Sequence, residues 1–590
     1  MWNCQAPPPV PPLPRRQRSR VKRPRPVDRA GAGRGAASRR QCPPVPRPLA
    51  GQGRTKQGTM VRRGRGIARG FLALLALLSL SSPAWAEGNR QELSIALSGQ
   101  STLDDPHQAR SGADFQYFEH IFDTLVTRDG FGVMPRLAIT WNSPDNRKWS
   151  FRIRNDARFS NGRSVTARDV AYSLCRFETL SRDVGGNYLG LSLVEITGTT
   201  SLTLHLDSAY RLLPAALSLV FIVAAPADGR GVGGPMGCDP AKVLAGRGSP
   251  QLGSGPYVAA DSPQANTRRL AASPYHGAES PPWRSLNLIS EPDARERLRL
   301  LLAGTVDIME DVSPFQLPYF QRQPNVHLTE LPTDRVLLLT FNMAPTDSDG
   351  RPNPLADSRV RRAINMAIDR WALVERGLAG VGGPAWQLAQ PGMEGWLPAR
   401  ATGPASDVQG ARHLLAEAGY PNGFAVDILM PRTRVTNQPR VVELLAGMLR
   451  AINIQAQVEP IEGAATRERI RKGDFTLAMS AIGLTAGSAM EGLEATAGPL
   501  FHHTGTNPSG YEDAQLTALL AKARAAPPAA IPALAMQATA ILDRDMPMIP
   551  LLHMRDLVAH RADLTIAASD TARAFGRITW PATAQLNPPP

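Results

Sequence analysis

The sequence has few cysteines and lacks the motifs that mark a catalytic site. Four cysteines occur in 590 residues, and none of them forms a closely spaced metal-binding pair. A nucleophile elbow, a phosphate-binding loop and a zinc-binding helix motif are absent as well. The spacing of the carboxylates singles out no acid–base pair. These absences favour binding over catalysis, and we expect no enzyme activity, no cofactor and no metal site.

The sequence also lacks an apolar run long enough to cross a membrane. The run at Phe71–Leu80 is well short of the roughly twenty residues that a spanning helix needs. It follows a cationic stretch that begins at Met60, and it precedes a small-x-small site that ends at Ala86. This layout is typical of a secretory signal peptide. We therefore expect residues 60–86 to be removed by cleavage near Ala86 and the part of the chain after Ala86 to be periplasmic.

Positive charge is confined to the front of the chain. Residues 1–86 hold 18 Lys and Arg and one acid, whereas residues 87–590 hold 48 Lys and Arg and 50 Asp and Glu. The formal charge of +15 therefore does not indicate a nucleic-acid partner. Residues 1–59 contain twelve prolines and few large apolar side chains, so they cannot form a core. We expect Met60 to be the true start and residues 1–59 to be an over-extended reading frame; a disordered basic arm is the alternative.

Two cysteines remain after this segment, because Cys4 and Cys42 lie before Met60. Cys175 and Cys238 are a candidate disulfide in an oxidising compartment, and two separate buried thiols are the alternative. On the chain-entropy model, a bridge that closes a loop of this length contributes about 4 kcal/mol.

Residues 87–590 are too many for one core and predict two or three domains. Alternating apolar and polar residues predict strands at 92–97, 149–154 and 201–207. Apolar residues at helical spacing predict a helix over 357–374, capped by Asp357 or Ser358. Another helix is predicted to end at Gly419. The chain is therefore predicted to be a mixed α/β protein.

Residues 118–174, "FEHIFDTLVTRDGFGVMPRLAITWNSPDNRKWSFRIRNDARFSNGRSVTARDVAYSL", resemble the signature region of the peptide/nickel-type (family 5) solute-binding proteins of ABC importers. Further similar segments follow in the family's order: "GSGPYV" at 253, "ERLRLLLAGTVDIMEDV" at 296, "LLLTFNMA" at 337, "DSRVRRAINMAIDR" at 357, "ARHLLAEAGYPNGF" at 411, "INIQAQVEP" at 452 and "DRDMPMIPLLH" at 543. Because these segments span nearly all of the chain after Ala86, the resemblance is specific.

The resemblance implies an α/β, two-lobed periplasmic-binding-protein fold (type II, cluster C-like) with an additional β-rich domain inserted in lobe I. The implied ranges are 87–120, 250–333 and 548–590 for lobe I, 121–249 for the inserted domain and 334–547 for lobe II. The crossings near Leu331–Val336 and Asp545–Pro550 would then form the hinge.

The resemblance also implies a function. The chain would be the substrate-binding component of an ABC importer, would capture a peptide or peptide-like solute between its lobes, and would deliver it to ABC permease subunits in the inner membrane. A receptor of the same family for nickel or a metal chelate, an opine, glutathione or a sugar is the alternative. An exported enzyme or a chaperone fits less well. We expect a monomer with a short-peptide or small-molecule ligand and no nucleic-acid partner.

Relatives that bind dipeptides hold the ligand with an arginine and an aspartate. Arg434 is similar in position to the arginine, with Arg432 as the second choice and a solvated surface arginine as the alternative reading. The segment that carries the aspartate in relatives has no carboxylate between Asp474 and Glu491 here. A free peptide N-terminus is therefore expected to bind poorly at this place. Gly483 and Gly487 are expected to bring backbone N–H groups close to the ligand, which would favour an acidic or neutral group.

Four further residues are candidate ligand contacts. Trp386 and Gln387 lie in a segment that resembles the family's cleft loop, where a tryptophan would stack on the ligand; ordinary core packing is the alternative. Tyr117 and Asp114, expected just before the first helix of lobe I, are the other two.

Overall fold

In the computed structural model, the structure describes residues 91–566 and 584–586, apart from 100, 110, 184–188, 228–237, 246–250, 263, 277–280, 348–349, 432–437, 499–506 and 508. They belong to one compact unit, Glu87–Pro590. The expected extension at 1–59, the expected signal peptide at 60–86 and the candidate ligand residues Arg432 and Arg434 lie outside the described residues.

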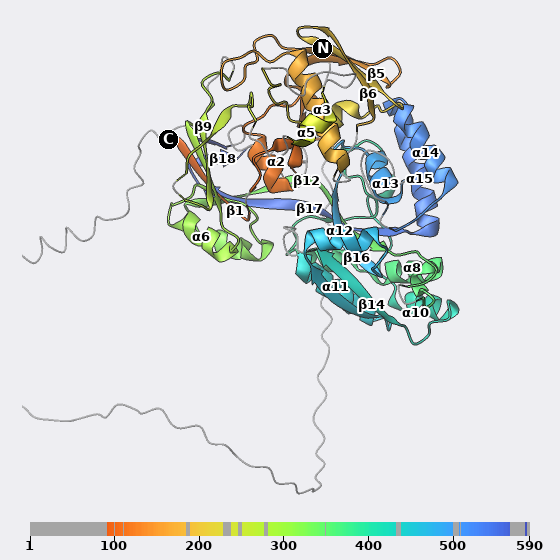
Figure 1. Cartoon of the computed structure of the whole chain (residues 1–590). Coiled ribbons are helices and arrows are strands. Elements are labelled where there is room, and N and C mark those ends of the chain that lie inside the picture. The colour runs from red at the N-terminus through yellow and green to blue at the C-terminus, as the bar shows by residue number, and fades with distance from the viewer. Residues whose placement is uncertain are drawn as a thin grey trace, which may run out of the picture. The chain divides into compact units, whose positions relative to one another are not determined.

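A mixed sheet of eleven strands is the centre of the described fold (Figure 1). Ten of its strands follow one another in the order β15 (Gln455–Ile461), β14 (Ala425–Pro431), β16 (Leu477–Gly483), β12 (Val326–Phe341), β17 (Met548–Arg561), β11 (Ile308–Met309), β1 (Glu92–Leu97), β10 (Ser285–Ser290), β9 (Thr267–Ala272) and β8 (Tyr257–Ala260). The eleventh, β13 (Gly383–Pro384), pairs with β17.

The long strands β12 and β17 connect the two halves of this sheet (Figure 1). Residues 326–332 of β12 pair with 555–561 of β17, next to β11. Residues 336–340 of β12 pair with β17 again from His553 to Met548, and their other edge pairs with β16. The register shifts between Pro332 and Val336. The chain therefore crosses twice between the halves, and the pairing of the two crossings is interrupted at one place.

Separate hydrophobic cores cover the two halves. One core includes Leu93, Ile95, Phe118, Leu286 and Val558. A second core includes Leu339, Phe341, Ile364, Ile428 and Leu445. Beside the second core, a further apolar cluster includes Leu388, Leu493, Leu520, Leu534 and Met548. Since each half buries its own apolar side chains, each half has the internal packing of a domain.

A smaller antiparallel sheet lies between β1 and β8 in the sequence. Its strands follow the order β4 (Ala138–Asn142), β5 (Lys148–Ile153), β7 (Ser201–Leu206) and β6 (Leu191–Gly198). Along β5, exposed and buried side chains alternate, because successive residues of a strand point to opposite faces. Helix α3 (Ala167–Asp183) packs on this sheet and forms a third core with it. That core includes Phe151, Ile153, Phe159, Leu174 and Leu204.

The remaining elements are further helices and two strand pairs. The helices are α2 (Gly112–Phe118), α4 (Leu213–Leu217), α5 (Pro240–Ala245), α6 (Ala294–Leu302), α7 (Leu317–Phe320), α10 (Val408–Glu417), α11 (Gln438–Arg450), α12 (Gly463–Arg471), α13 (Ala489–Ala497), α14 (Ala514–Ala525) and α15 (Ile531–Asp545). The hairpin of β2 (Val126–Asp129) and β3 (Gly132–Pro135) and the pair of β18 (Leu564–Ile566) and β19 (Ala584–Leu586) complete the strands.

The single helix predicted over 357–374 is interrupted. Helix α8 (Ser358–Ala367) begins as expected, with the Asp357 side chain accepting a hydrogen bond from the Arg359 N–H. Ile368 has an extended backbone, with ψ at 114°. Asp369 then caps a new turn, α9 (Arg370–Ala372), which leads into the π-helical turn η4 (Leu373–Gly377). The prediction of one helix was wrong at this point because an Asp cap within an apolar pattern starts a second helix.

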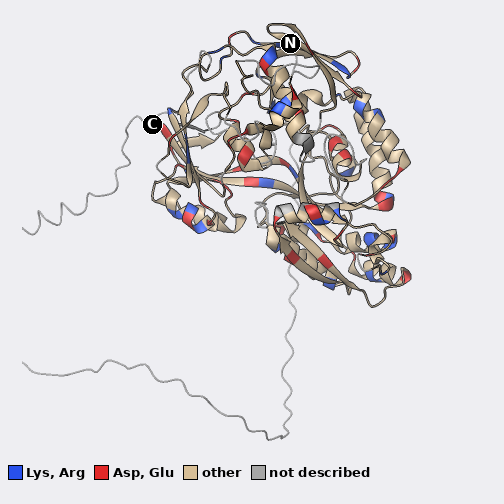
Figure 2. Cartoon of the chain, viewed as in Figure 1, with Lys and Arg blue, Asp and Glu red and all other residues tan. Residues whose placement is uncertain are grey.

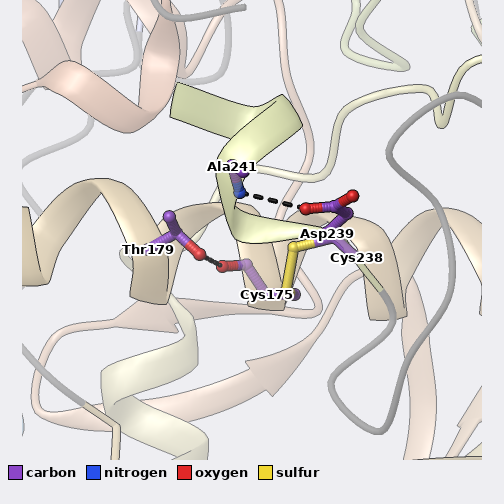
Figure 3. Close-up of a disulfide and its surroundings, with 5 residues drawn as sticks. All are labelled: Cys175, Thr179, Cys238, Asp239 and Ala241. Atoms are coloured by element: carbon purple, nitrogen blue, oxygen red, sulfur yellow. Dashed lines mark hydrogen bonds between the residues drawn. A yellow bond between two sulfur atoms is a disulfide. The ribbon is translucent and has the colours of Figure 1, made fainter. Parts of the chain in front are cut away.

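Cys175 and Cys238 form a disulfide (Figure 3). The bond joins α3 to the residues just before α5, with the two Cα atoms 5.7 Å apart. Around it, Thr179 Oγ1 donates to the Cys175 carbonyl at 2.8 Å, and the Ala241 N–H donates to Asp239 at 3.1 Å. Of the two alternatives for these cysteines, the structure has the bridge.

Charges of both signs are interspersed on the described helices. On α6 and α10, for example, basic and acidic residues lie close together (Figure 2). This mixture agrees with the nearly neutral composition of residues 87–590.

Candidate functional site

The turn of the β2–β3 hairpin lies against segments that follow β13 and β16. Gly130 has a φ of 63°, which allows the tight turn. Phe131, at the tip, packs on the apolar cluster beside the second core. A Cβ on Gly487 would lie 2.8 Å from the Phe131 Cβ, and a Cβ on Gly392 would lie 3.4 Å from the Phe131 ring. Glycine at 487 therefore allows the hairpin tip to approach the backbone there.

Arg128, in the same hairpin, lies next to Asp334 of β12. The Arg128 Nη1 and Asp334 Oδ2 atoms are 4.0 Å apart, and both side chains are buried. Arg128 Nη2 also donates to the Gly130 carbonyl at 3.0 Å. Asp334 lies at the register shift of β12, so this ion pair connects the hairpin to the crossing between the sheet halves.

Glu491, in the first turn of α13, is the second carboxylate near Arg128. Its Oε2 accepts a hydrogen bond from the Ala486 N–H at 2.6 Å. Burial raises the pKa of Glu491 to about 8, and the negative charge of Asp334 adds to the increase. The hydrogen bond from Ala486 and the charge of Arg128 oppose it. We call Arg128, Asp334 and Glu491 the charged cluster.

Gly483 ends β16 beside this cluster. It pairs with Arg335 of β12, and a Cβ at this position would lie 3.3 Å from Asp334 Oδ1. The segment between Asp474 and Glu491 has no carboxylate, but β12 supplies Asp334 to this place through strand pairing. The expected poor binding of a peptide N-terminus stays a prediction, and Asp334 is an argument against it.

Further polar contacts stabilise the backbone of β12 at its register shift. Arg335 forms an ion pair with Asp556 of β17, and burial raises the pKa of Asp556 while Arg335 opposes that increase. Thr333 Oγ1 donates to the Met554 carbonyl at 2.8 Å, and Gln390 Nε2 donates to the Thr333 carbonyl at 2.9 Å. Both crossing strands and the segment after β13 therefore meet at this point.

A second contact joins the smaller sheet's domain to the segments around α13 and α14. Arg211, just before α4, forms an ion pair with Glu394 and donates to Ser488 Oγ at 3.4 Å. Its Nε donates to the Ala523 carbonyl at 3.1 Å, and its backbone N–H donates to the Arg524 carbonyl at 3.0 Å. Side chain and backbone of one residue thus contact three segments.

Trp386 and Gln387 lie away from the charged cluster's contacts. Both line a cavity of about 150 Å³ bounded by residues of α8, α13, α15 and the start of β17. The Gln387 amide is bonded to the backbone of Leu397, accepting from its N–H and donating to its carbonyl, each at 2.9 Å. Gln387 therefore holds its own loop in place, and Trp386 faces a different space from Gly483.

Tyr117 and Asp114 have partners within the first core. Asp114 completes the capping box of α2 with Ser111, whose N–H donates to Asp114 at 2.9 Å. Tyr117 packs under the Arg268 guanidinium, 5.2 Å from its ring centre, and burial raises its pKa. The described contacts of these two residues do not include Gly483 or the charged cluster.

Sequence reasoning missed Arg128, Asp334 and Glu491. One signal was available, because the charged residues Asp334 and Arg335 come directly before the apolar run 336–339 of β12. Within the described ranges, no group of three or more His, Cys, Asp or Glu is arranged to hold a metal ion. In the same part of the chain, no helix has both the length and the apolar character needed to span a membrane.

Comparisons with known proteins agree with this architecture. The family model for bacterial extracellular solute-binding proteins, family 5 (middle), matches residues 132–500. Heme-binding protein A of Haemophilus influenzae is 25% identical over 387 residues, which cover 61% of this chain and 68% of that protein. The dipeptide-binding protein of Escherichia coli is 23% identical over 378 residues, which cover 59% and 67%.

Among solved structures, the periplasmic binding protein DppA of Helicobacter pylori in complex with the peptide STSA is similar, with a TM-score of 0.70. The match covers 84% of this chain and 98% of that chain at 19% sequence identity. This likeness confirms the expected two-lobed α/β fold. The matched proteins are binding proteins rather than enzymes.

Proposed function

We propose that this chain, which belongs to the bacterial extracellular solute-binding proteins of family 5, is the substrate-binding component of an ABC importer. It captures a peptide or peptide-like solute between its lobes and delivers it to the permease subunits in the inner membrane. A ligand that binds both lobes favours the closed form by its differential affinity for that form, and the permease distinguishes this form from the open one.

One observation carries the placement of the ligand: charged side chains from three distant segments meet where β12 shifts register. Arg128 comes from the hairpin, Asp334 from the crossing strand and Glu491 from α13. A zwitterionic peptide has a carboxylate and an ammonium group, which Arg128 and Asp334 complement. Phe131 adds an aromatic surface beside them.

The domain ranges given above are part of this proposal, with one adjustment. The interruption in β12 between Pro332 and Val336 lies opposite His553 and Arg555 of β17. We therefore place the second hinge crossing at 553–555 instead of at Asp545–Pro550. Residues 548–552 then belong to lobe II, because they pair with the half of β12 that adjoins β16.

Other features of the proposal come from the sequence. Residues 60–86 direct export and are removed near Ala86, and the exported protein acts as a periplasmic monomer. Arg434, with Arg432 as the second choice, binds a ligand carboxylate. Heme and dipeptides are named as the ligands of the two relatives above, so a receptor for another small solute, such as a metal chelate, an opine, glutathione or a sugar, is the alternative.

Calorimetric titration of the exported protein tests the proposal. The ligands are dipeptides, tripeptides, glutathione, an opine, a sugar and a nickel chelate. We expect saturable binding of a peptide or peptide-like ligand, and at least tenfold weaker binding in Asp334→Asn and in Arg434→Ala, which corresponds to about 1.4 kcal/mol.

Arg154→Ala is the control, because Arg154 forms an exposed ion pair with Asp156 on the smaller sheet's domain. Its affinity should equal that of the wild type. Thermal unfolding of each variant separates lost binding from lost folding. Binding of the sugar or nickel chelate alone would favour the alternative, and unchanged affinity in Asp334→Asn would contradict the placement of the ligand.

A further inference from the structure

We propose that the cavity lined by Trp386 is a binding site for a small organic monocarboxylate, separate from the charged cluster. The cavity has a volume of about 150 Å³ and lies between α13, α15, the α8–α9 segment and the first residues of β17. We call it the Trp386 cavity. Its ligand is a compact carboxylate with an aromatic or branched apolar group.

Arg370 gives the Trp386 cavity a buried positive charge. Its side chain is only 7% exposed. Its Nε donates to the Ala385 carbonyl at 2.8 Å and the Pro550 carbonyl at 2.9 Å, and its Nη2 donates to Asn365 Oδ1 at 2.8 Å. All three acceptors are neutral, and no carboxylate among the described residues pairs with Arg370.

A buried cation without a counter-ion is costly, and a bound anion removes that cost. Burial alone lowers the pKa of Arg370 to about 10, so the guanidinium stays charged at neutral pH. Nη1 of Arg370 has no hydrogen-bond partner among the described residues and is therefore the free donor of this side chain at the cavity.

Arg400 and Trp386 also line the cavity and carry polar groups. Arg400 pairs with Asp543, with Nη2 2.8 Å from Oδ1. Arg400 Nε and the Trp386 indole N–H are both buried and have no acceptor in the described part of the chain. With Arg370, Arg400 and Asp543 as the charged residues of the lining, the net charge of the cavity is +1, which suits a monoanion.

The remaining wall suits an apolar group. It is formed by Leu493, Leu542, Met546, Met548 and Ile549. The Trp386 ring centre lies 5.8 Å from the Arg370 guanidinium, and the indole edge with Cδ1 and Nε1 packs so closely on Gly403 that a Cβ there would lie 2.1 Å from both atoms. The ring is therefore held in place. Benzene occupies an engineered protein cavity of about this volume, so a carboxylate with one ring or a short branched chain is the size that fits.

Benzoate and its neutral analogue benzamide test this site in the full chain. Titration calorimetry should show saturable benzoate binding and at least tenfold weaker benzamide binding. Arg400→Gln, which removes one guanidinium, should weaken benzoate binding at least fivefold. Thr539→Phe should abolish it, because Thr539 lines the cavity and the added ring fills it. Arg412→Gln, at an exposed arginine that donates to the Ala451 carbonyl, should bind benzoate like the wild type.

The two sites are distinguished by the Asp334→Asn variant. It should keep full benzoate affinity, since Asp334 does not line the Trp386 cavity, whatever its effect on peptide binding. Equal binding of benzoate and benzamide, absence of saturable benzoate binding, or unchanged affinity in Thr539→Phe would each overturn the proposal. Each variant must show the cooperative thermal unfolding of the wild type, and Arg400→Gln and Thr539→Phe probe the cavity independently of each other.

Discussion

The protonation of Glu491 sets the net charge of the charged cluster. Burial raises its pKa to about 8, so the carboxyl group is mostly protonated at pH 7. Arg128 then lies opposite Asp334 while Glu491 remains neutral. A protonated carboxyl group can also donate a hydrogen bond. The cluster therefore offers a ligand both a cation and a neutral donor at neutral pH.

Glu491→Gln is predicted to change how stability depends on pH. In the unfolded chain the carboxyl ionises near its ordinary pKa of 4.5, whereas in the folded protein it holds its proton up to about pH 8. Between these values the folded state binds more protons than the unfolded state, so the stability contributed by this group falls as pH rises. The glutamine variant lacks this loss.

Urea unfolding at pH 5 and at pH 8 measures the effect. We expect the difference in unfolding free energy between Glu491→Gln and the wild type to be about 1–2 kcal/mol larger at pH 8 than at pH 5. One pKa unit corresponds to about 1.4 kcal/mol, and the expected difference is modest because the Glu491 residue is only partly buried. Glu443→Gln, at an exposed position on α11, is the control and should show no such gain. Parallel pH profiles for Glu491→Gln and the wild type would contradict the assigned pKa.

At the scale of elements, local patterns predicted the strands well. The predicted strands at 92–97, 149–154 and 201–207 correspond to β1, β5 and β7. Alternation of apolar and polar residues is a local property, and burial alternates as it predicts along β5, whereas β1 and β7 are buried over most of both faces. The helix over 357–374 was predicted less well, because the cap at Asp369 competes with an apolar pattern that continues through it.

The charged cluster could not be predicted from local sequence patterns. Arg128, Asp334 and Glu491 are each more than 150 residues apart in the sequence, and strand register and hairpin placement bring them together. The absence of a carboxylate between Asp474 and Glu491 was read correctly from the sequence, but pairing between β12 and β16 places Asp334 beside Gly483. Gln387 stays a predicted ligand contact, and its amide is bonded to the backbone of Leu397 in its own loop.

The disulfide between α3 and the segment before α5 is predicted to stabilise the inserted domain. The double variant Cys175→Ser/Cys238→Ser should lose up to about 4 kcal/mol of unfolding free energy, because the bond closes a loop with a sequence separation of 63. Urea unfolding of the wild type, with and without a reductant, measures the same quantity.

Reduced wild type and the double variant should unfold at the same urea concentration, below that of the oxidised wild type. The reductant should have no effect on the double variant, which serves as the control for effects of the reductant other than reduction of this bond. Identical midpoints for the oxidised wild type and the double variant would show that the bond contributes nothing.

At the scale of the whole molecule, two connections between the lobes differ in kind. Strands β12 and β17 run continuously from one half of the sheet to the other (Figure 1), so they persist in any open or closed form. The contacts of Arg211 with Glu394 and Ser488 are made by side chains and are lost when the segments separate. With the hinge proposed above, at the β12 register shift, opening would break the Arg211 contacts and leave the strands paired.

Arg211→Ala is accordingly predicted to shift the unliganded protein towards its open form. The side chains of Arg211 and Glu394 are largely buried, and hydrogen bonds to charged groups contribute about 1.5–3 kcal/mol each. Since about 1.4 kcal/mol changes an equilibrium constant tenfold, loss of this contact is enough to shift the equilibrium between the closed and open forms. Small-angle scattering should show a larger radius of gyration for the variant without ligand, and saturating ligand should restore the wild-type value, since the ligand binds the closed form more tightly. The affinity should fall at least severalfold, because part of the binding energy is used to close the lobes.

Arg154→Ala, which removes an exposed ion pair within the smaller sheet's domain, should leave both the radius of gyration and the affinity unchanged. An unchanged radius of gyration and affinity in Arg211→Ala would mean that other contacts stabilise the closed form. The proposed role of Arg211 in holding the lobes together would then be wrong.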